Sequence, residues 1–176
     1  GKSRTEVFDP SMRSANETQT ALAAELARAI ENGDLVLHYQ PILELETRTV
    51  VGYEALVRWQ HPTRGLLLPG AFLPLLEDRK LSVALGIALV DQAAEFLATT
   101  NTDDAWVSLN VSADQLGDSQ FADRVLSSIG RYHLSPQRIV VELTEASLVA
   151  PNTRIRHELT ELRNAGVPIL LDDFGT

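Results

Sequence analysis

Three short apolar segments decide the fold of this chain: AWVSLNV (105–111), RIVVEL (138–143) and VPILLD (167–172). Between them lie two segments, 121–132 and 154–165, with the length and apolar spacing of amphipathic helices. Strands that alternate with helices in this way build βαβ units with parallel strands. Parallel strands are buried on both faces and show nearly continuous apolar runs, as Ile139–Val141 does. The sequence therefore predicts an α/β domain with a parallel sheet or barrel.

The residues before this series predict a helix, two strands and two further helices: 18–30, 36–42, 50–59, 69–78 and 81–98. Leu22, Leu26 and Ile30 give the first helix one apolar side. Residues 1–17 are predicted to be a linker from an upstream domain, and residues 18–176 to form the domain itself.

The composition bounds the class of protein. The 176 residues are 44% hydrophobic and 22% charged, which is typical of one globular core. The formal net charge of -9 excludes the basic surface that polymeric nucleic acid requires. Cysteine is absent, which excludes disulfides, thiolate nucleophiles and cysteine-ligated zinc. No apolar run approaches the roughly 18 residues of a membrane span. We expect a cytoplasmic location, with any membrane anchor of the parent protein outside these residues.

Acidic or amide side chains lie at or near the ends of four predicted strands: Glu54, Asn110, Glu142 and Asp172. In a (β/α) barrel the carboxyl ends of the strands form the active site, so these groups would converge. Ser108 and Asn110 share one face of their strand, because side chains alternate along it. Clustered carboxylates repel one another unless cations neutralise them, and oxygen-only ligands suit Mg²⁺ or Mn²⁺. Two such ions can activate water and hold a phosphodiester.

Each of these residues also has a simpler interpretation when it is taken alone. A single strand-end acid is commonly a solvated group, Asn110 can cap the turn that follows it, and Asp172 with Asp173 can start a helix. The histidines share no helix face or strand end, so we expect packing or surface positions for all of them: His38, His61, His133 and His157.

Five motifs decide between these interpretations: YQPI (39–42), EALVRW (54–59), LNVS (109–112), VELTE (141–145) and LLDDFGT (170–176). Their order and spacing resemble the EAL-domain family of cyclic diguanylate (c-di-GMP) phosphodiesterases over about residues 20–176. The resemblance implies an α/β fold that is the N-terminal portion of a TIM-like (β/α)8 barrel, with about five strands present. Because such a barrel takes about 250 residues, we expect the chain to be an excerpt of a longer protein.

The resemblance implies a role for each motif residue. Two Mg²⁺ or Mn²⁺ ions would be held by the metal ligands Glu54, Asn110, Glu142, Asp172 and Asp173. Among these, Glu54 and Asp173 are also assigned to catalysis. The dinucleotide would be contacted by Gln40, Leu56, Arg58 and Pro69. Arg58 would contact a phosphate through its planar guanidinium. The implied reaction is hydrolysis of c-di-GMP to linear pGpG.

The family's general-base lysine is expected beyond Thr176, so we predict that these residues alone are inactive. The alternative is a module that binds c-di-GMP without hydrolysis or only mediates association, since fold alone does not fix function. The open edge of a partial barrel favours a homodimer. Residues 1–13 are similar to the exit of a GGDEF domain, which implies an upstream GGDEF-like domain.

Overall fold

The computed structural model describes residues 10–76, 78–100, 104–144 and 153–172, with the backbone alone for 10–18, 144 and 172. The elements in chain order are α1 (Pro10–Asn32), β1 (Leu35–Leu43), β2 (Val50–His61), β3 (Gly65–Leu67), α2 (Pro69–Phe72), η1 (Leu73–Leu75), α3 (Arg79–Thr99), β4 (Trp106–Asn110), α4 (Ala113–Leu116), α5 (Phe121–Arg131), η2 (Pro136–Arg138), β5 (Ile139–Thr144), α7 (Thr153–Asn164) and β6 (Ile169–Asp172).

The strands form one sheet in the order β1-β2-β4-β5-β6, and β3 pairs with β2 off this path. β1 runs antiparallel to β2 as a hairpin, whereas β2, β4, β5 and β6 are parallel to one another. Each step between parallel strands passes through a helix, which confirms the βαβ series expected from the sequence.

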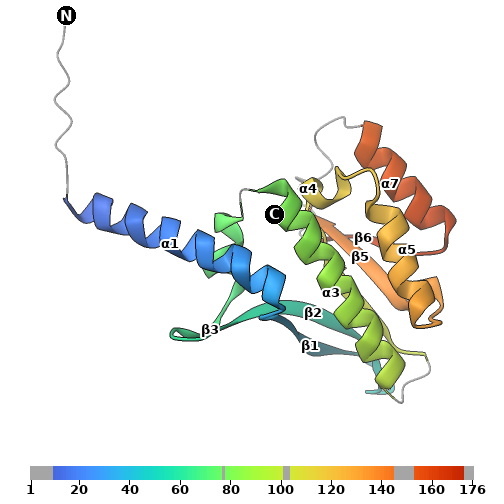
Figure 1. Ribbon diagram of the computed structural model, residues 1–176. Helices are drawn as coiled ribbons and strands as arrows, with labels where there is room; N and C mark the ends of the chain where they lie inside the picture. Colours follow the sequence, from blue (N-terminus) through green and yellow to red (C-terminus); the bar gives the residue numbers. More distant parts are fainter. Residues whose placement is uncertain (1–9, 77, 101–103, 145–152, 173–176) are drawn as a thin grey trace, which may run out of the picture.

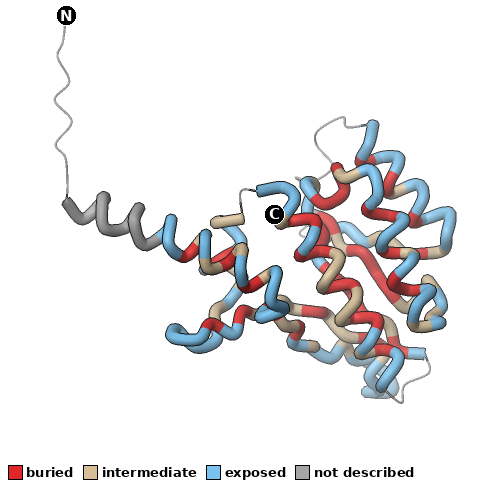
Figure 2. Tube along the Cα trace, in the orientation of Figure 1, coloured by how far each residue is buried: buried red, intermediate tan, exposed pale blue. Residues whose placement is uncertain are grey.

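Helices α3, α5 and α7 lie along one side of the parallel strands, as Figure 1 shows. Buried residues gather where the helices face the sheet (Figure 2). Val107, Leu109, Val141 and Leu143 are each at most 3% exposed and alternate along β4 and β5, so they form the helix-facing layer. We call this side of the sheet the outer face and the opposite side the inner face.

The structure differs from the sequence prediction mainly in its short elements. α1 begins at Pro10, earlier than the predicted residue 18. The predicted helix 69–78 is one turn of α-helix followed by a 3-10 turn that ends at Leu75. β3 and α4 were not predicted, because three or four residues are too few to show a period. Gly65, with a φ of 72°, turns the chain into β3.

α3 is long and apolar enough by composition to cross a membrane, with a mean hydropathy of 1.6. Half of that stretch is buried inside the domain, and the helix carries Asp91, Gln92 and Glu95. The side-chain amide of Gln92 makes two hydrogen bonds to β1: its Nε2 donates to the Leu35 carbonyl oxygen, and its Oε1 accepts from the Leu37 N–H. α3 is therefore the central core helix of this domain.

Candidate active site

The sheet register brings three of the predicted metal ligands, Glu54, Asn110 and Glu142, to the inner face. Glu54 of β2 lies opposite Ser108 of β4, and Asn110 of β4 lies opposite Glu142 of β5. Ser108 and Asn110 are two residues apart, so all four side chains lie on one side of the sheet. The helix-facing neighbours Leu109 and Val141 point the other way and are buried. Three strands thus place an amide and two carboxylates on one surface, as the sequence predicts.

Predicted ligand-contacting residues of β1 and β2 lie on the same face. Gln40 pairs with Glu54 across the hairpin, and His38 pairs with Leu56. Arg58, two residues beyond Leu56, is half-buried and donates to the Val57 carbonyl oxygen at 2.8 Å. Its guanidinium retains further N–H groups beyond this one bond, because arginine carries five.

The donor set fits a hard divalent cation by chemistry, because carboxylate and amide oxygens are the ligands that Mg²⁺ and Mn²⁺ prefer. Within the described ranges, no three His, Asp or Glu side chains come close enough together to hold an ion. The backbone of Asp172 pairs with Thr144 at the end of β6. The side chain of Asp172 and all of Asp173 lie outside the described part of the chain.

A cavity of about 440 Å³ opens beside the carboxyl ends of β2 and β4. Leu56, Pro69 and Asn110, which the sequence assigns to the site, line it together. Its apolar wall comes from η1 and α3, and its polar wall from Ser112, Asp114 and Gln115 around α4. The cavity does not include Glu54, Gln40, Arg58 or Glu142, so the site has two parts: an open polar inner face and an adjacent, mostly apolar pocket.

Gln115 supports the pocket wall and was not singled out from the sequence. Its Oε1 accepts from the Ser112 N–H at 2.9 Å, while its Nε2 donates to the Ser82 carbonyl oxygen of α3 at 3.0 Å. With Ser112 it forms a capping box on α4, a signal that the spacing S-x-x-Q already carries. The Val111 N–H is also bound, to the Glu142 carbonyl oxygen at 2.9 Å. Both backbone N–H groups after Asn110 are therefore fixed.

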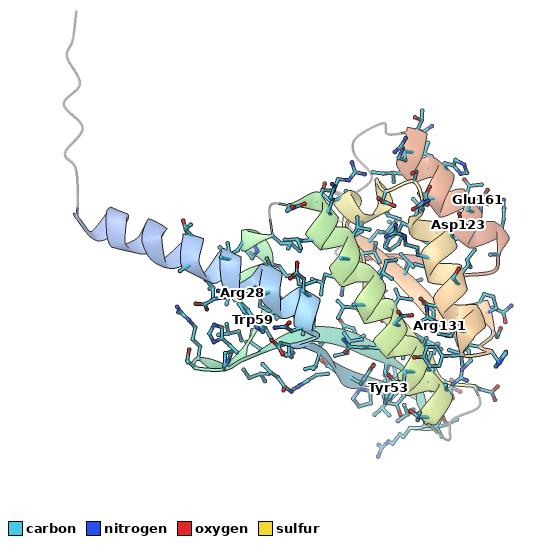
Figure 3. All side chains as sticks on the ribbon, viewed as in Figure 1. Arg28, Tyr53, Trp59, Asp123, Arg131 and Glu161 are labelled. Carbon is cyan, nitrogen blue, oxygen red and sulfur yellow. The ribbon has the colours of Figure 1, made fainter. Side chains whose placement is uncertain are left out.

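The buried histidine lies away from the inner face. His61 is 6% exposed, and its Nε2 lies 2.6 Å from Glu25 Oε2 of α1. Its Nδ1 accepts from the Thr63 and Arg64 N–H groups, which assigns the ring proton to Nε2. His61 lines a second cavity of about 340 Å³ with Trp59 and Arg28, whose labels lie close together in Figure 3. His61 packs at the junction of α1 with β2, which agrees with the structural role expected for it.

A family model and similar proteins point to the same family. The family model for the EAL domain matches residues 23–176. The bifunctional diguanylate cyclase/cyclic di-GMP phosphodiesterase MucR of Pseudomonas aeruginosa is 36% identical over 174 residues, which are 96% of this chain and 25% of that protein. An uncharacterized protein of Mycobacterium tuberculosis is 38% identical over 174 residues, 97% of this chain and 28% of its own length. The chain thus spans about a quarter of these relatives.

Solved structures show the same fold. PaMucR phosphodiesterase in complex with c-di-GMP superposes with a TM-score of 0.81 at 35% identity, covering 89% of this chain and 64% of that chain. EAL enzyme Bd1971 in a form with cAMP and cyclic-di-GMP bound gives a TM-score of 0.83 at 29% identity, covering 92% of this chain and 46% of that chain. The predicted fold class, the N-terminal portion of a TIM-like barrel, is confirmed.

Proposed function

The chain belongs to the EAL-domain family, and from that premise we propose that it provides the first half of the active site of a metal-dependent c-di-GMP phosphodiesterase. The observation that carries the proposal is the shared inner face of Glu54, Asn110 and Glu142, three oxygen-donor side chains on adjacent parallel strands. Two relatives support it, since MucR is a bifunctional diguanylate cyclase/cyclic di-GMP phosphodiesterase and PaMucR phosphodiesterase is solved in complex with c-di-GMP.

In this proposal Glu54, Asn110, Glu142, Asp172 and Asp173 hold two Mg²⁺ or Mn²⁺ ions. When bound, such ions lower the pKa of a coordinated water and neutralise charge on a phosphodiester. The chain's own residues bind and orient the dinucleotide. Arg58 contacts a phosphate with its remaining N–H groups, and Gln40, beside Glu54 on the hairpin, contacts the ligand through its amide.

Leu56 and Pro69 supply apolar contact from the edge of the pocket. The product is linear pGpG. The net charge of -9 supports a requirement for cations, because an acidic chain repels a dinucleotide that carries two phosphates. We propose that the reaction takes place in the cytoplasm, with a GGDEF-like domain upstream and a second copy of the chain as partners.

We further propose that these 176 residues do not complete the reaction alone, because the general-base lysine of the family's pattern lies on a later strand. The alternative, a receptor that binds c-di-GMP without cleaving it, has the same inner face. Binding without turnover in the full-length protein would favour the receptor.

Replacing Glu54 with Ala in the full-length protein that carries these residues tests the proposal. We expect formation of pGpG, measured by anion-exchange chromatography, to fall by roughly 100-fold or more, since even residues that only support a metal ligand account for up to about that factor. Glu46→Ala, in the exposed β1–β2 turn, is the matched control and keeps full turnover. Unchanged turnover in Glu54→Ala contradicts the metal assignment.

A further inference from the structure

The Ser108 hydroxyl is a buried polar group that needs an explanation. Ser108 is 0% exposed, and its Oγ finds no hydrogen-bond partner among the residues that the structure describes. A buried hydroxyl without a partner destabilises the fold, because it gives up its bonds to water and gains none. Unsatisfied groups of this kind are rare, and a missing ion is one of the explanations for them.

The neighbours of Ser108 on the inner face are known from the register. Glu54 lies directly opposite on β2, and Val140 lies directly opposite on β5. Val140 is apolar, so the side-chain acceptor directly across a strand is the Glu54 carboxylate. Adjacent strands lie about 4.8 Å apart, and directly opposed side chains on one face are within reach of each other.

Trp106 closes the space on the amino-terminal side of this pair. It precedes Ser108 by two residues on the same face, and it lies opposite Gly52. A Cβ at Gly52 would come within 2.5 Å of the Trp106 ring atoms Cδ2 and Cε2, so the indole fills the place of that side chain. The indole therefore packs over Gly52, next to the Glu54–Ser108 pair on the same face.

We propose that Ser108 is a positioning residue for Glu54, an inference that rests on the proposed function. When Glu54 ligates a cation through one carboxylate oxygen, the Ser108 Oγ–H donates to the other oxygen. Hydrogen bonds of this kind orient metal ligands, and their loss typically weakens metal binding by about 10 to 100-fold. In this arrangement the Ser108 hydroxyl gains a hydrogen-bond partner as the ion binds.

Titration of the chain with Mn²⁺, followed by the loss of the free-ion signal in electron paramagnetic resonance, tests this inference. We expect Ser108→Ala to raise the dissociation constant for Mn²⁺ by about 10-fold. The same variant keeps or raises the melting temperature of the metal-free chain, because it removes an unpaired buried hydroxyl. A purely structural serine would show the opposite pattern, a lower melting temperature and unchanged Mn²⁺ affinity.

Three further variants complete the design. Ser128→Ala makes the same change at another buried serine, 1% exposed and on α5, and leaves Mn²⁺ affinity unchanged. Ser108→Cys keeps a weaker donor of similar size and gives an intermediate affinity.

Glu54→Ala separates the positioning role of Ser108 from the proposed metal site. If it weakens Mn²⁺ binding while Ser108→Ala does not, the positioning role is overturned and the metal site stands. If the chain does not bind Mn²⁺, or Glu54→Ala binds it as tightly, both are overturned.

Discussion

The position of Tyr39 in the sheet changes the protonation of its phenol. On the outer face its ring stacks on Phe96 at 3.7 Å between centroids, and its hydroxyl donates to the Gln92 carbonyl oxygen at 3.2 Å. Burial raises the pKa of the Tyr39 phenol above its ordinary value, and the nearby Glu95 carboxylate raises the pKa further. The phenol therefore stays protonated in the folded chain at pH values where the unfolded chain ionises it.

This pKa shift predicts a loss of stability in alkali. Above about pH 10 the unfolded chain releases the Tyr39 proton and the folded chain keeps it, so the free energy of unfolding falls as the pH rises. Below pH 10 the contribution is fully present. Urea denaturation from pH 8 to 11 measures the slope of the free energy of unfolding against pH. Tyr39→Phe keeps the ring and lacks the phenol, so its slope is smaller. Equal slopes in the two chains would contradict the prediction.

At the scale of elements, α5 is capped by a neighbouring helix. Its N-cap residue, Gln120, makes no side-chain capping bond. Glu158 of α7, only 4% exposed, accepts from the Ala122 N–H at 2.9 Å instead. Glu158→Ala leaves this buried N–H unpaired, so we expect the free energy of unfolding to fall by about 2 kcal/mol in urea denaturation. Glu161→Ala, an exposed change one turn away on α7, is the control and has little effect. A similar small effect for Glu158→Ala would refute this capping role.

The contact between α3 and α4 predicts how a glycine substitution in α3 changes stability. A Cβ at Gly86 of α3 would lie 2.8 Å from Gln115 Nε2, whereas a Cβ at Gly130 of α5 meets nothing within 4 Å. Gly86→Ala displaces the Gln115 amide from Ser82 and destabilises the chain by about 1 to 2 kcal/mol. Gly130→Ala stabilises it by about 0.5 to 1 kcal/mol, because alanine favours helix. Thermal unfolding of the two variants measures both changes. A stability change of the same sign in both variants would contradict the prediction.

Across the whole molecule, the sequence predicts most of the sheet and part of the site. Short apolar runs such as Ile139–Val141 favour a parallel strand because they alternate with helix-length segments, and side-chain alternation puts Ser108 and Asn110 on one face. The bond from Gln115 to Ser82 joins residues 33 positions apart, so no local pattern reveals it. The same holds for Glu158 and α5, because the partner belongs to another helix.

The central claim is that the inner face binds c-di-GMP through divalent cations. Isothermal titration of the chain with c-di-GMP, in Mg²⁺ and in chelator, tests it most directly. We predict binding in Mg²⁺, markedly weaker binding in chelator, and weaker binding in Mg²⁺ after Arg58→Ala, which removes a phosphate contact. Binding that is equal in Mg²⁺ and chelator and unaffected by Arg58→Ala, or no binding in either condition, would contradict the claim.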